Sequence, residues 1–144
     1  DRTDINEDAE DSPVNTSTTE VNLIPSMVEV YFNNLCNLGC IYCNADYSTV
    51  WEVEDVKFGL ADSHTLQDRK RAREQYPAML EAHWKWLKNN AQGIKAYNIL
   101  GGEPFFQPEF EQNIEFFENN PCPDLRFTIF TNLKVNKDKM KRIR

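Results

Sequence analysis

Three short runs of β-branched, aromatic and aliphatic residues alternate along the chain with segments of helical apolar spacing. The runs cover residues 27–32, 95–100 and 125–129, and each has the length of an ordinary strand. Strands that alternate with helices usually pair side by side in parallel. The sequence therefore predicts an α/β fold in which right-handed crossovers place the carboxyl ends of all three strands at one edge of a parallel sheet.

The segments between these runs predict several helices. Residues 44–64 show no clear period, while 65–75 predict a charged helix. Pro77 suits the first position of a separate helix, and Pro108 suits the first position of another. The basic stretch 134–144 opens a further helix. The apolar face of the helix that begins at Pro77 is expected to carry Met79, Leu80, His83, Trp84 and Leu87.

The first 20 residues have a different composition from the rest of the chain. They contain seven acidic residues, with Arg2 as the sole basic one. Such a segment buries too little apolar surface to offset the entropy cost of ordering it. We therefore expect residues 1–20 to be an acidic, disordered tail or linker and 21–144 to form one domain. Because the chain begins at Asp1 and ends at Arg144 inside an expected helix, we read it as a fragment of a longer protein.

The net charge and the lack of long apolar runs indicate which kinds of binding partner to expect. The net charge of -7 disfavours a nucleic-acid binder, whose surface is usually basic. No apolar run approaches the length of a membrane span, and no secretory leader is visible. We therefore expect a cytoplasmic protein that binds neither nucleic acid nor membrane.

Three cysteines, Cys36, Cys40 and Cys43, lie within eight residues directly after the first run. A disulfide framework is disfavoured because nothing indicates an oxidising compartment. Structural zinc usually has four closed ligands, often in CxxC pairs. An iron–sulfur cubane is ordinarily held by four thiolates, so three would leave one iron open. The fourth cysteine, Cys122, is flanked by prolines and is expected to pack as a small apolar side chain.

Two motifs give the chain a specific resemblance. The pattern CxxxCxxC with an aromatic residue before the third cysteine, here Tyr42-Cys43, resembles the signature of the radical S-adenosylmethionine (SAM) superfamily. One strand later, Leu100-Gly101-Gly102-Glu103-Pro104 resembles that family's second motif. The pairing is most similar to the GGEP-containing branch, which includes peptide and protein maturases.

The resemblance implies a role for each matching residue. Cys36, Cys40 and Cys43 would ligate a [4Fe-4S] cluster, and the open iron would chelate S-adenosyl-L-methionine. Tyr42 would help to seat the adenine, and Asn132, after the third strand, would contact the cofactor. The loop expected to hold the methionine amino group of the cofactor comprises Gly101, Gly102, Glu103 and Pro104.

The same resemblance implies an architecture and a reaction. The chain would form the first three strand–helix units of a partial (β/α)6 TIM-like barrel, the N-terminal half of the family's core domain. Reductive cleavage of SAM would produce a 5′-deoxyadenosyl radical that abstracts hydrogen from an unknown substrate, with a peptide or protein as the class suggested by the branch. An electron donor such as flavodoxin or ferredoxin would be the partner.

Two other functions stay open at this stage. An iron–sulfur electron-transfer protein would require a fourth thiolate, and Cys122 is the remaining candidate. A zinc-stabilised binding module would use the same cysteines without redox chemistry. About fifty residues separate Cys43 from the second strand, more than a helical crossover needs. We expect this insertion to cap or shape the site.

Overall fold

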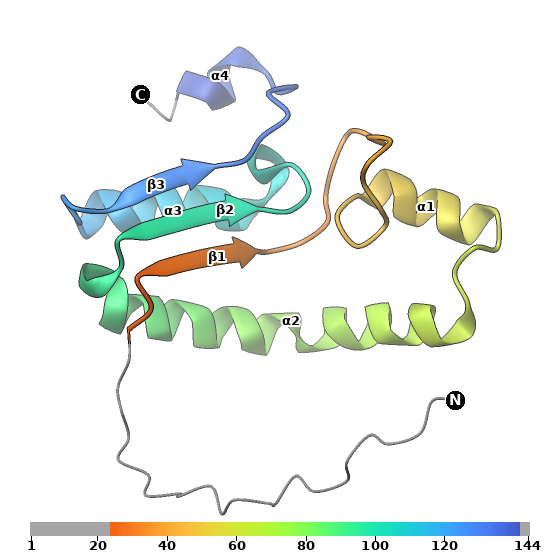
Figure 1. Cartoon of the computed structure of the whole chain (residues 1–144), viewed down its shortest axis with the longest axis horizontal. Coiled ribbons are helices and arrows are strands. Elements are labelled where there is room, and N and C mark those ends of the chain that lie inside the picture. The colour runs from red at the N-terminus through yellow and green to blue at the C-terminus, as the bar shows by residue number, and fades with distance from the viewer. Residues whose placement is uncertain (1–23, 142–144) are drawn as a thin grey trace, which may run out of the picture.

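The computed structural model describes residues 24–141 of the chain. Three strands, β1 (Met27–Tyr31), β2 (Ala96–Leu100) and β3 (Arg126–Ile129), form one sheet in the order β1-β2-β3 (Figure 1). Both pairings are parallel. The expected α/β fold with a parallel sheet is confirmed, while the expected acidic tail, 1–20, lies outside the described residues.

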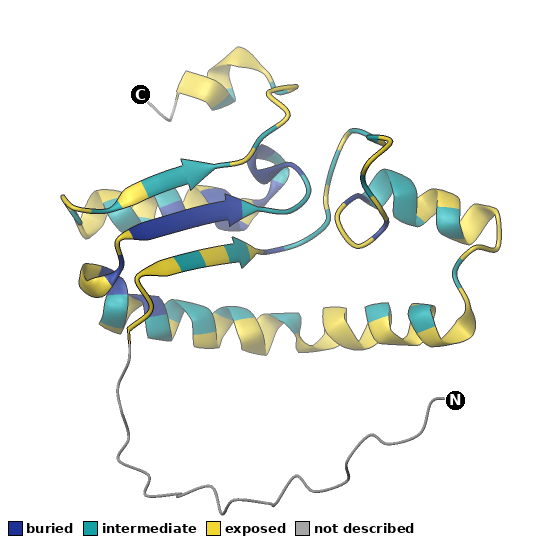
Figure 2. Ribbon diagram, viewed as in Figure 1, coloured by how far each residue is buried: buried dark blue, intermediate teal, exposed yellow. Residues whose placement is uncertain are grey.

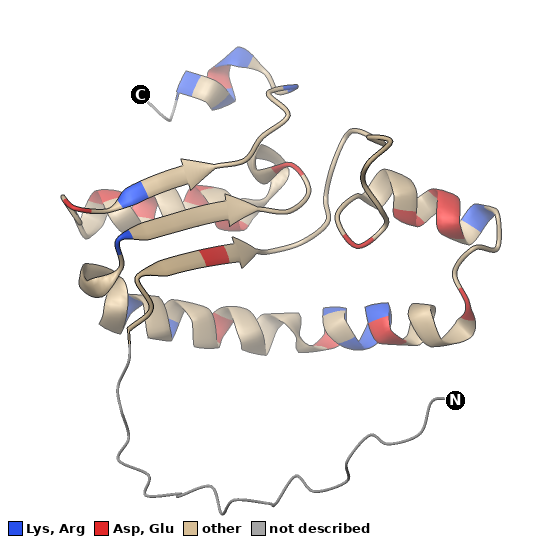
Figure 3. Ribbon diagram, in the orientation of Figure 1, with Lys and Arg blue, Asp and Glu red and all other residues tan. Residues whose placement is uncertain are grey.

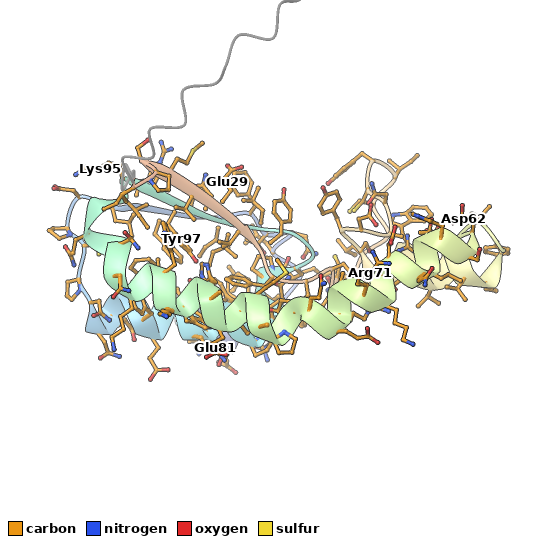
Figure 4. The ribbon with its side chains drawn as sticks, turned by 90° about the horizontal axis from the view of Figure 1, so that it is seen from below. Glu29, Asp62, Arg71, Glu81, Lys95 and Tyr97 are labelled. Atoms are coloured by element: carbon orange, nitrogen blue, oxygen red, sulfur yellow. The ribbon has the colours of Figure 1, made fainter. Side chains whose placement is uncertain are left out.

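Four α-helices accompany the sheet in the described part of the chain: α1 (Thr49–Lys57), α2 (Ser63–Asn90), α3 (Pro108–Asn119) and α4 (Lys137–Met140). Two short 3₁₀ turns, η1 (Ala91–Gly93) and η2 (Pro104–Phe106), flank β2. Helices α2 and α3 lie on the same face of the sheet (Figures 1 and 4). Within residues 24–141, no helix combines the length and the apolar character that crossing a membrane requires.

Two expectations for residues 44–90 were wrong. The segment expected to be irregular contains α1, and the two helices expected on either side of residue 76 form the single helix α2. The carboxylate of Asp62 caps α2 by accepting a hydrogen bond from the Thr65 N–H at 2.7 Å. Pro77 is exposed inside the helix, where its ring removes the one backbone bond that would reach the Arg73 carbonyl. Packing of the second half of α2 on the sheet outweighs this loss.

The core fills the space between the sheet and α2 and α3. Side chains alternate along each strand. The first four residues of β2 are buried and Leu100 at its end is half-buried, so β2 is the most deeply buried strand (Figure 2). Tyr97 of β2 lies between the sheet and α2 (Figure 4), and its hydroxyl lies 3.0 Å from His83 Nε2 and donates to Asn113 at 2.7 Å. The buried cluster comprises Phe32, Leu87, Ala91, Ile94, Tyr97, Ile99, Phe105 and Phe110.

The opposite face of the sheet is polar near its centre. Asn98 of β2 donates a hydrogen bond to the Glu29 carboxylate of β1 at 2.9 Å, and these two residues are register partners. Since all three strands are parallel, their carboxyl ends share one edge of the sheet. The cysteine segment, the Gly101-Gly102 turn and the Thr131-Asn132 segment each follow a strand at that edge.

Candidate functional site

A cavity of about 580 Å³ opens at the carboxyl edge of the sheet. Residues from all three strand ends line it, and these segments lie far apart in the sequence. Among the residues predicted from sequence, it brings together the three clustered cysteines, one tyrosine, two glycines and one asparagine. Its wall comprises Tyr31, Cys36, Leu38, Cys40, Tyr42, Cys43, Tyr47, Leu100, Gly101, Gly102, Ile129, Phe130, Thr131 and Asn132.

The N-terminus of α1 holds the cysteine loop from behind. The Thr49 hydroxyl donates a hydrogen bond to the Cys36 carbonyl at 3.0 Å and accepts one from the Cys36 N–H at 3.2 Å. The buried hydroxyl of Ser48 donates to the Leu38 carbonyl at 2.8 Å. The indole of Trp51 donates to the Cys40 carbonyl at 2.9 Å. Side chains of the insertion thus fix the loop backbone, which leaves the thiols free for another task.

The turn after β2 approaches the cysteine loop so closely that it has no room for side chains. Gly101 and Gly102 have φ angles of 80° and 31°, a region that favours glycine. A Cβ atom on Gly102 would lie 2.3 Å from the Leu35 carbonyl oxygen, and one on Gly101 would lie 2.6 Å from the Tyr31 ring. The next residue donates its backbone N–H to the same Leu35 carbonyl at 2.7 Å. Both glycines are therefore required by geometry.

The carboxylate of Glu103 is sealed inside the protein rather than exposed to the cavity. The residue is 0% exposed. One carboxylate oxygen accepts from the Thr131 hydroxyl at 2.7 Å and from the Phe105 N–H at 3.3 Å, and the other accepts from the Asn132 N–H at 2.8 Å. Pro104 beside it is also buried. The cavity wall is thus formed by the glycines, while Glu103 joins the β2 turn to the end of β3.

Asn132 extends this connection to the cysteine loop. Its side-chain amide donates to Asn37 Oδ1 at 3.0 Å and lies 3.9 Å from the Cys36 sulfur. Asn37 in turn donates to the Lys134 carbonyl at 3.0 Å. Hydrogen bonds therefore link all three loops at the carboxyl edge.

Tyr42 stands at the outer rim of the cavity. Its side chain and that of Ile41 project into solvent, with 90% and 95% of each residue exposed. The pKa of the Tyr42 phenol is raised, first by its hydrogen bond with Cys40 and by the charge on that thiol, and then by desolvation and the charges of Cys43 and Cys36. The phenol therefore lies near the three thiols.

Cys122 lies at the other edge of the sheet. It precedes β3, and its carbonyl accepts from the Leu125 N–H at 3.0 Å. The four residues of β3 span about 13 Å, which separates this sulfur from the cysteine loop. Cys122 packs against the core cluster, as expected, and does not line the cavity.

The donor chemistry of the cavity suits a soft metal group. All four cysteines are free, and the three that line the cavity offer thiolate ligands of the kind that iron–sulfur clusters use. Within residues 24–141, no three His, Cys, Asp or Glu side chains are grouped closely enough to hold one metal ion. In donor type and in cavity size, the residues present fit an iron–sulfur cluster.

Sequence reasoning missed several residues of this site. Tyr31 and Tyr47 form part of the wall, with ring centroids 5.3 Å apart. Alternation along the first strand places Tyr31 on the face away from the helices, which was a usable signal. The supporting role of Ser48, Thr49 and Trp51 had no such signal because the contacts join a helix start to a loop ten to thirteen residues earlier.

The sequence model of the family described as the Radical SAM superfamily matches residues 30–144. No match was found among curated proteins, and none was found among solved structures.

Proposed function

The chain belongs to the radical SAM superfamily, and on this premise we propose that Cys36, Cys40 and Cys43 ligate a [4Fe-4S] cluster in a radical SAM enzyme. The observation that carries the proposal is the cavity at the carboxyl edge, which these three cysteines share with Gly101 and Gly102. Membership of the superfamily indicates an enzyme and the general kind of chemistry. The assignment of the cluster to these three residues is ours.

When bound, the cluster and SAM supply a one-electron cleavage of the sulfonium carbon–sulfur bond, giving methionine and a 5′-deoxyadenosyl radical that takes a hydrogen atom from the substrate. The three thiolates would hold the cluster and leave one iron without a protein ligand, where the amino and carboxylate groups of SAM would bind. The backbone carbonyls of Gly101 and Gly102 would accept hydrogen bonds from the amino group, because the absence of Cβ atoms allows close approach.

The remaining residues orient the cofactor and exclude water. Tyr42, at the cavity rim, would help to seat the adenine. Asn132 lies beside Cys36 and contributes an amide to the polar wall. Glu103 and Pro104 support the turn from behind, since the carboxylate of Glu103 joins it to the end of β3.

Finer features of the proposal come from the motif resemblance. We assign the chain to the GGEP-containing branch and to the first three units of a partial (β/α)6 barrel. The substrate is a peptide or protein, and a flavodoxin or ferredoxin supplies the electron. The setting is the reducing cytoplasm, and the net charge of -7 supports partners other than nucleic acid.

Anaerobic reconstitution with iron and sulfide tests the assignment. We expect about four irons and four sulfides per chain, a reduced cluster visible by electron paramagnetic resonance, and a changed spectrum on addition of SAM. Cys40→Ala should abolish loading. Cys122→Ala is the matched control and should retain full loading, because this residue lies at the opposite edge of the sheet.

Each alternative predicts a different result. Zinc in place of iron and sulfide would overturn the cluster assignment in favour of a binding module. Loss of the cluster in Cys122→Ala, together with a spectrum that ignores SAM, would instead identify an electron carrier with four thiolates.

A further inference from the structure

A second cavity, of about 420 Å³, lies beside the first. It is bounded by α2, by α1 and by the segment that follows β1. Tyr31 and Tyr47 line both cavities, so this ring pair is the wall between them. A ligand bound in the second cavity would therefore be separated from the cysteine cavity only by the rings of Tyr31 and Tyr47. The other residues of its wall are Phe32, Asn33, Asn34, Ala45, Asp46, Glu52, Arg69, Ala72, Arg73 and Tyr76.

Arg69 lines this cavity and has unused hydrogen-bond donors. Its Nη2 lies 3.1 Å from the Asp55 carboxylate and 3.7 Å from that of Asp46. Its Nε and Nη1 are buried and have no hydrogen-bond acceptor within residues 24–141. The buried Tyr76 hydroxyl makes no hydrogen bond of good geometry there either, although burial and then the nearby Glu109 carboxylate raise the pKa of this phenol. A buried polar group without a partner costs about 1–3 kcal/mol. The unpaired donors therefore favour a ligand with oxygen atoms that accept hydrogen bonds.

The charges around Arg69 decide what kind of acceptor fits. Charged side chains gather on α1 and on the half of α2 that faces it (Figure 3). Asp55 already balances Arg69, and Arg73 forms an ion pair with Glu52. Burial alone would raise the pKa of Glu52, but its hydrogen bond from Asn34 and its ion pair with Arg73 lower it, so Glu52 stays ionised near neutral pH.

Asp46 is then the carboxylate left over in the wall. Its side chain is 68% exposed, and its contact with Arg69 is long. A second anion in this cavity would meet that charge at close range, which disfavours a carboxylate or phosphate ligand. Neutral carbonyl oxygens suit the Arg69 donors, and a cationic group suits Asp46.

We propose that this second cavity binds an extended peptide segment that carries a basic side chain. Backbone carbonyls of the peptide accept hydrogen bonds from Nε and Nη1 of Arg69, and a lysine or arginine of the peptide pairs with Asp46. The four aromatic rings of the wall, Tyr31, Phe32, Tyr47 and Tyr76, pack against the peptide. The proposal deepens the proposed function, because the next residues of such a peptide would extend past Tyr31 and Tyr47 toward the cysteine cavity.

Binding of short probe peptides tests the proposal. The probes are acetyl-Ala-Lys-Ala-amide, its norleucine analogue and its glutamate analogue, titrated into the full chain and followed by NMR chemical shifts or calorimetry. We expect the affinity to fall in the order Lys, norleucine, Glu. Asp46→Asn should remove the preference of Lys over norleucine, because it removes the pairing charge.

Variants of Arg69 test its donors. Arg69→Lys keeps a positive charge beside Asp55 but lacks the two unused donors, and it should weaken every probe about tenfold, the effect of about 1.4 kcal/mol. Arg71→Lys is the matched control, since Arg71 lies on the same helix with 62% of its side chain exposed (Figure 4). Tyr76→Phe keeps the ring and provides a second variant, with an expected loss of a few-fold in affinity.

The outcomes separate this proposal from the proposed function. Peptide binding is measured on chain with and without reconstituted iron. Lys-selective binding that needs Arg69, in a chain that never loads a cluster, would support the peptide site and sink the enzyme. Cluster loading and 5′-deoxyadenosine release with no peptide binding, with equal binding of the three probes, or with binding indifferent to Arg69→Lys, would overturn the peptide site alone.

Discussion

At the scale of single residues, Glu103 shows what a motif can and cannot convey. The sequence indicated that this acid belongs to the site, and the structure places it directly behind the cavity. Its partners, Thr131 and Asn132, lie 28 and 29 residues away. Spacing within the motif carries no information on such contacts, so the burial of the carboxylate was not predictable.

Replacing Glu103 with Gln tests this connection. A glutamine offers one acceptor oxygen and turns an N–H₂ group toward a donor, so at least one of the three hydrogen bonds is lost and the charge that strengthens the others is removed. We expect the free energy of unfolding to fall by about 2 kcal/mol, measured by urea denaturation. Glu118→Gln, on the exposed side of α3, should change stability by less than about 0.5 kcal/mol. Equal effects in the two variants would contradict a connecting role for Glu103.

Gly102 provides a second prediction at this scale. Gly102→Ala combines a strained φ with a contact of 2.3 Å between the new Cβ and a backbone oxygen, and it should cost about 3 kcal/mol. Gly59→Ala is the matched control. Gly59 has a φ of 66° but nothing within 4 Å of its Cβ position, so it should cost about 1 kcal/mol. Thermal unfolding compares the two, and iron content should fall in Gly102→Ala alone.

At the scale of elements, hydrophobic period identified the strands and α3, because each buries a face set by its own side chains. Hydrophobic periodicity did not predict the helices between Cys43 and β2 correctly. Helix α1 has no fully buried residue, and its role is to anchor the cysteine loop through polar groups. The N-terminal half of α2 is charged and carries no apolar stripe, so the proline was mistaken for a helix start.

The proline inside α2 gives a prediction for this element. Pro77→Ala restores a backbone hydrogen bond at an exposed position, although it also loosens the unfolded chain. The first effect is larger, so we expect the free energy of unfolding to rise by about 2 kcal/mol. Pro108→Ala is the control, because proline is favourable at the first position of α3, and it should give no gain. A loss of stability in Pro77→Ala would mean that the proline shapes α2 for another reason.

At the scale of the whole molecule, the alternation of strands and helices predicted the parallel sheet and the edge at which the strands end together. That edge in turn predicted where the cysteine cavity lies. The second cavity could not be predicted from the sequence. It is formed by Arg69 and Tyr76 of α2 together with Asp46 of the loop before α1, two segments that no short-range pattern connects. The N-terminal half of α2 has little apolar character, and hydrophobic periodicity does not predict how such a helix packs against distant segments.

The packing of α2 on the sheet predicts a pH dependence of global stability. Burial lowers the pKa of His83 from its usual 6.5, so the folded state favours the neutral imidazole. The unfolded chain then binds more protons as the pH falls below about 6.5, and stability decreases in that direction until the lower folded pKa is passed. Urea midpoints measured from pH 7.5 to pH 5 should decline in the wild type, and His83→Gln should flatten the decline.

The other histidine provides the control for this measurement. His64 lies in the first turn of α2 with 83% of its side chain exposed, and His64→Gln should keep the decline of the wild type. A decline that persists in His83→Gln would assign the pH dependence to other groups.

Because Cys122 lies away from the cysteine cavity, the number of reactive thiols reports how much iron the other three cysteines hold. When the other three sulfurs hold iron, an alkylating reagent added without denaturant finds at most one thiol per molecule, and after the iron is stripped it finds up to four. Counting blocked sulfurs by mass spectrometry therefore reports occupancy directly on the chain. Such a count needs neither turnover nor knowledge of the substrate.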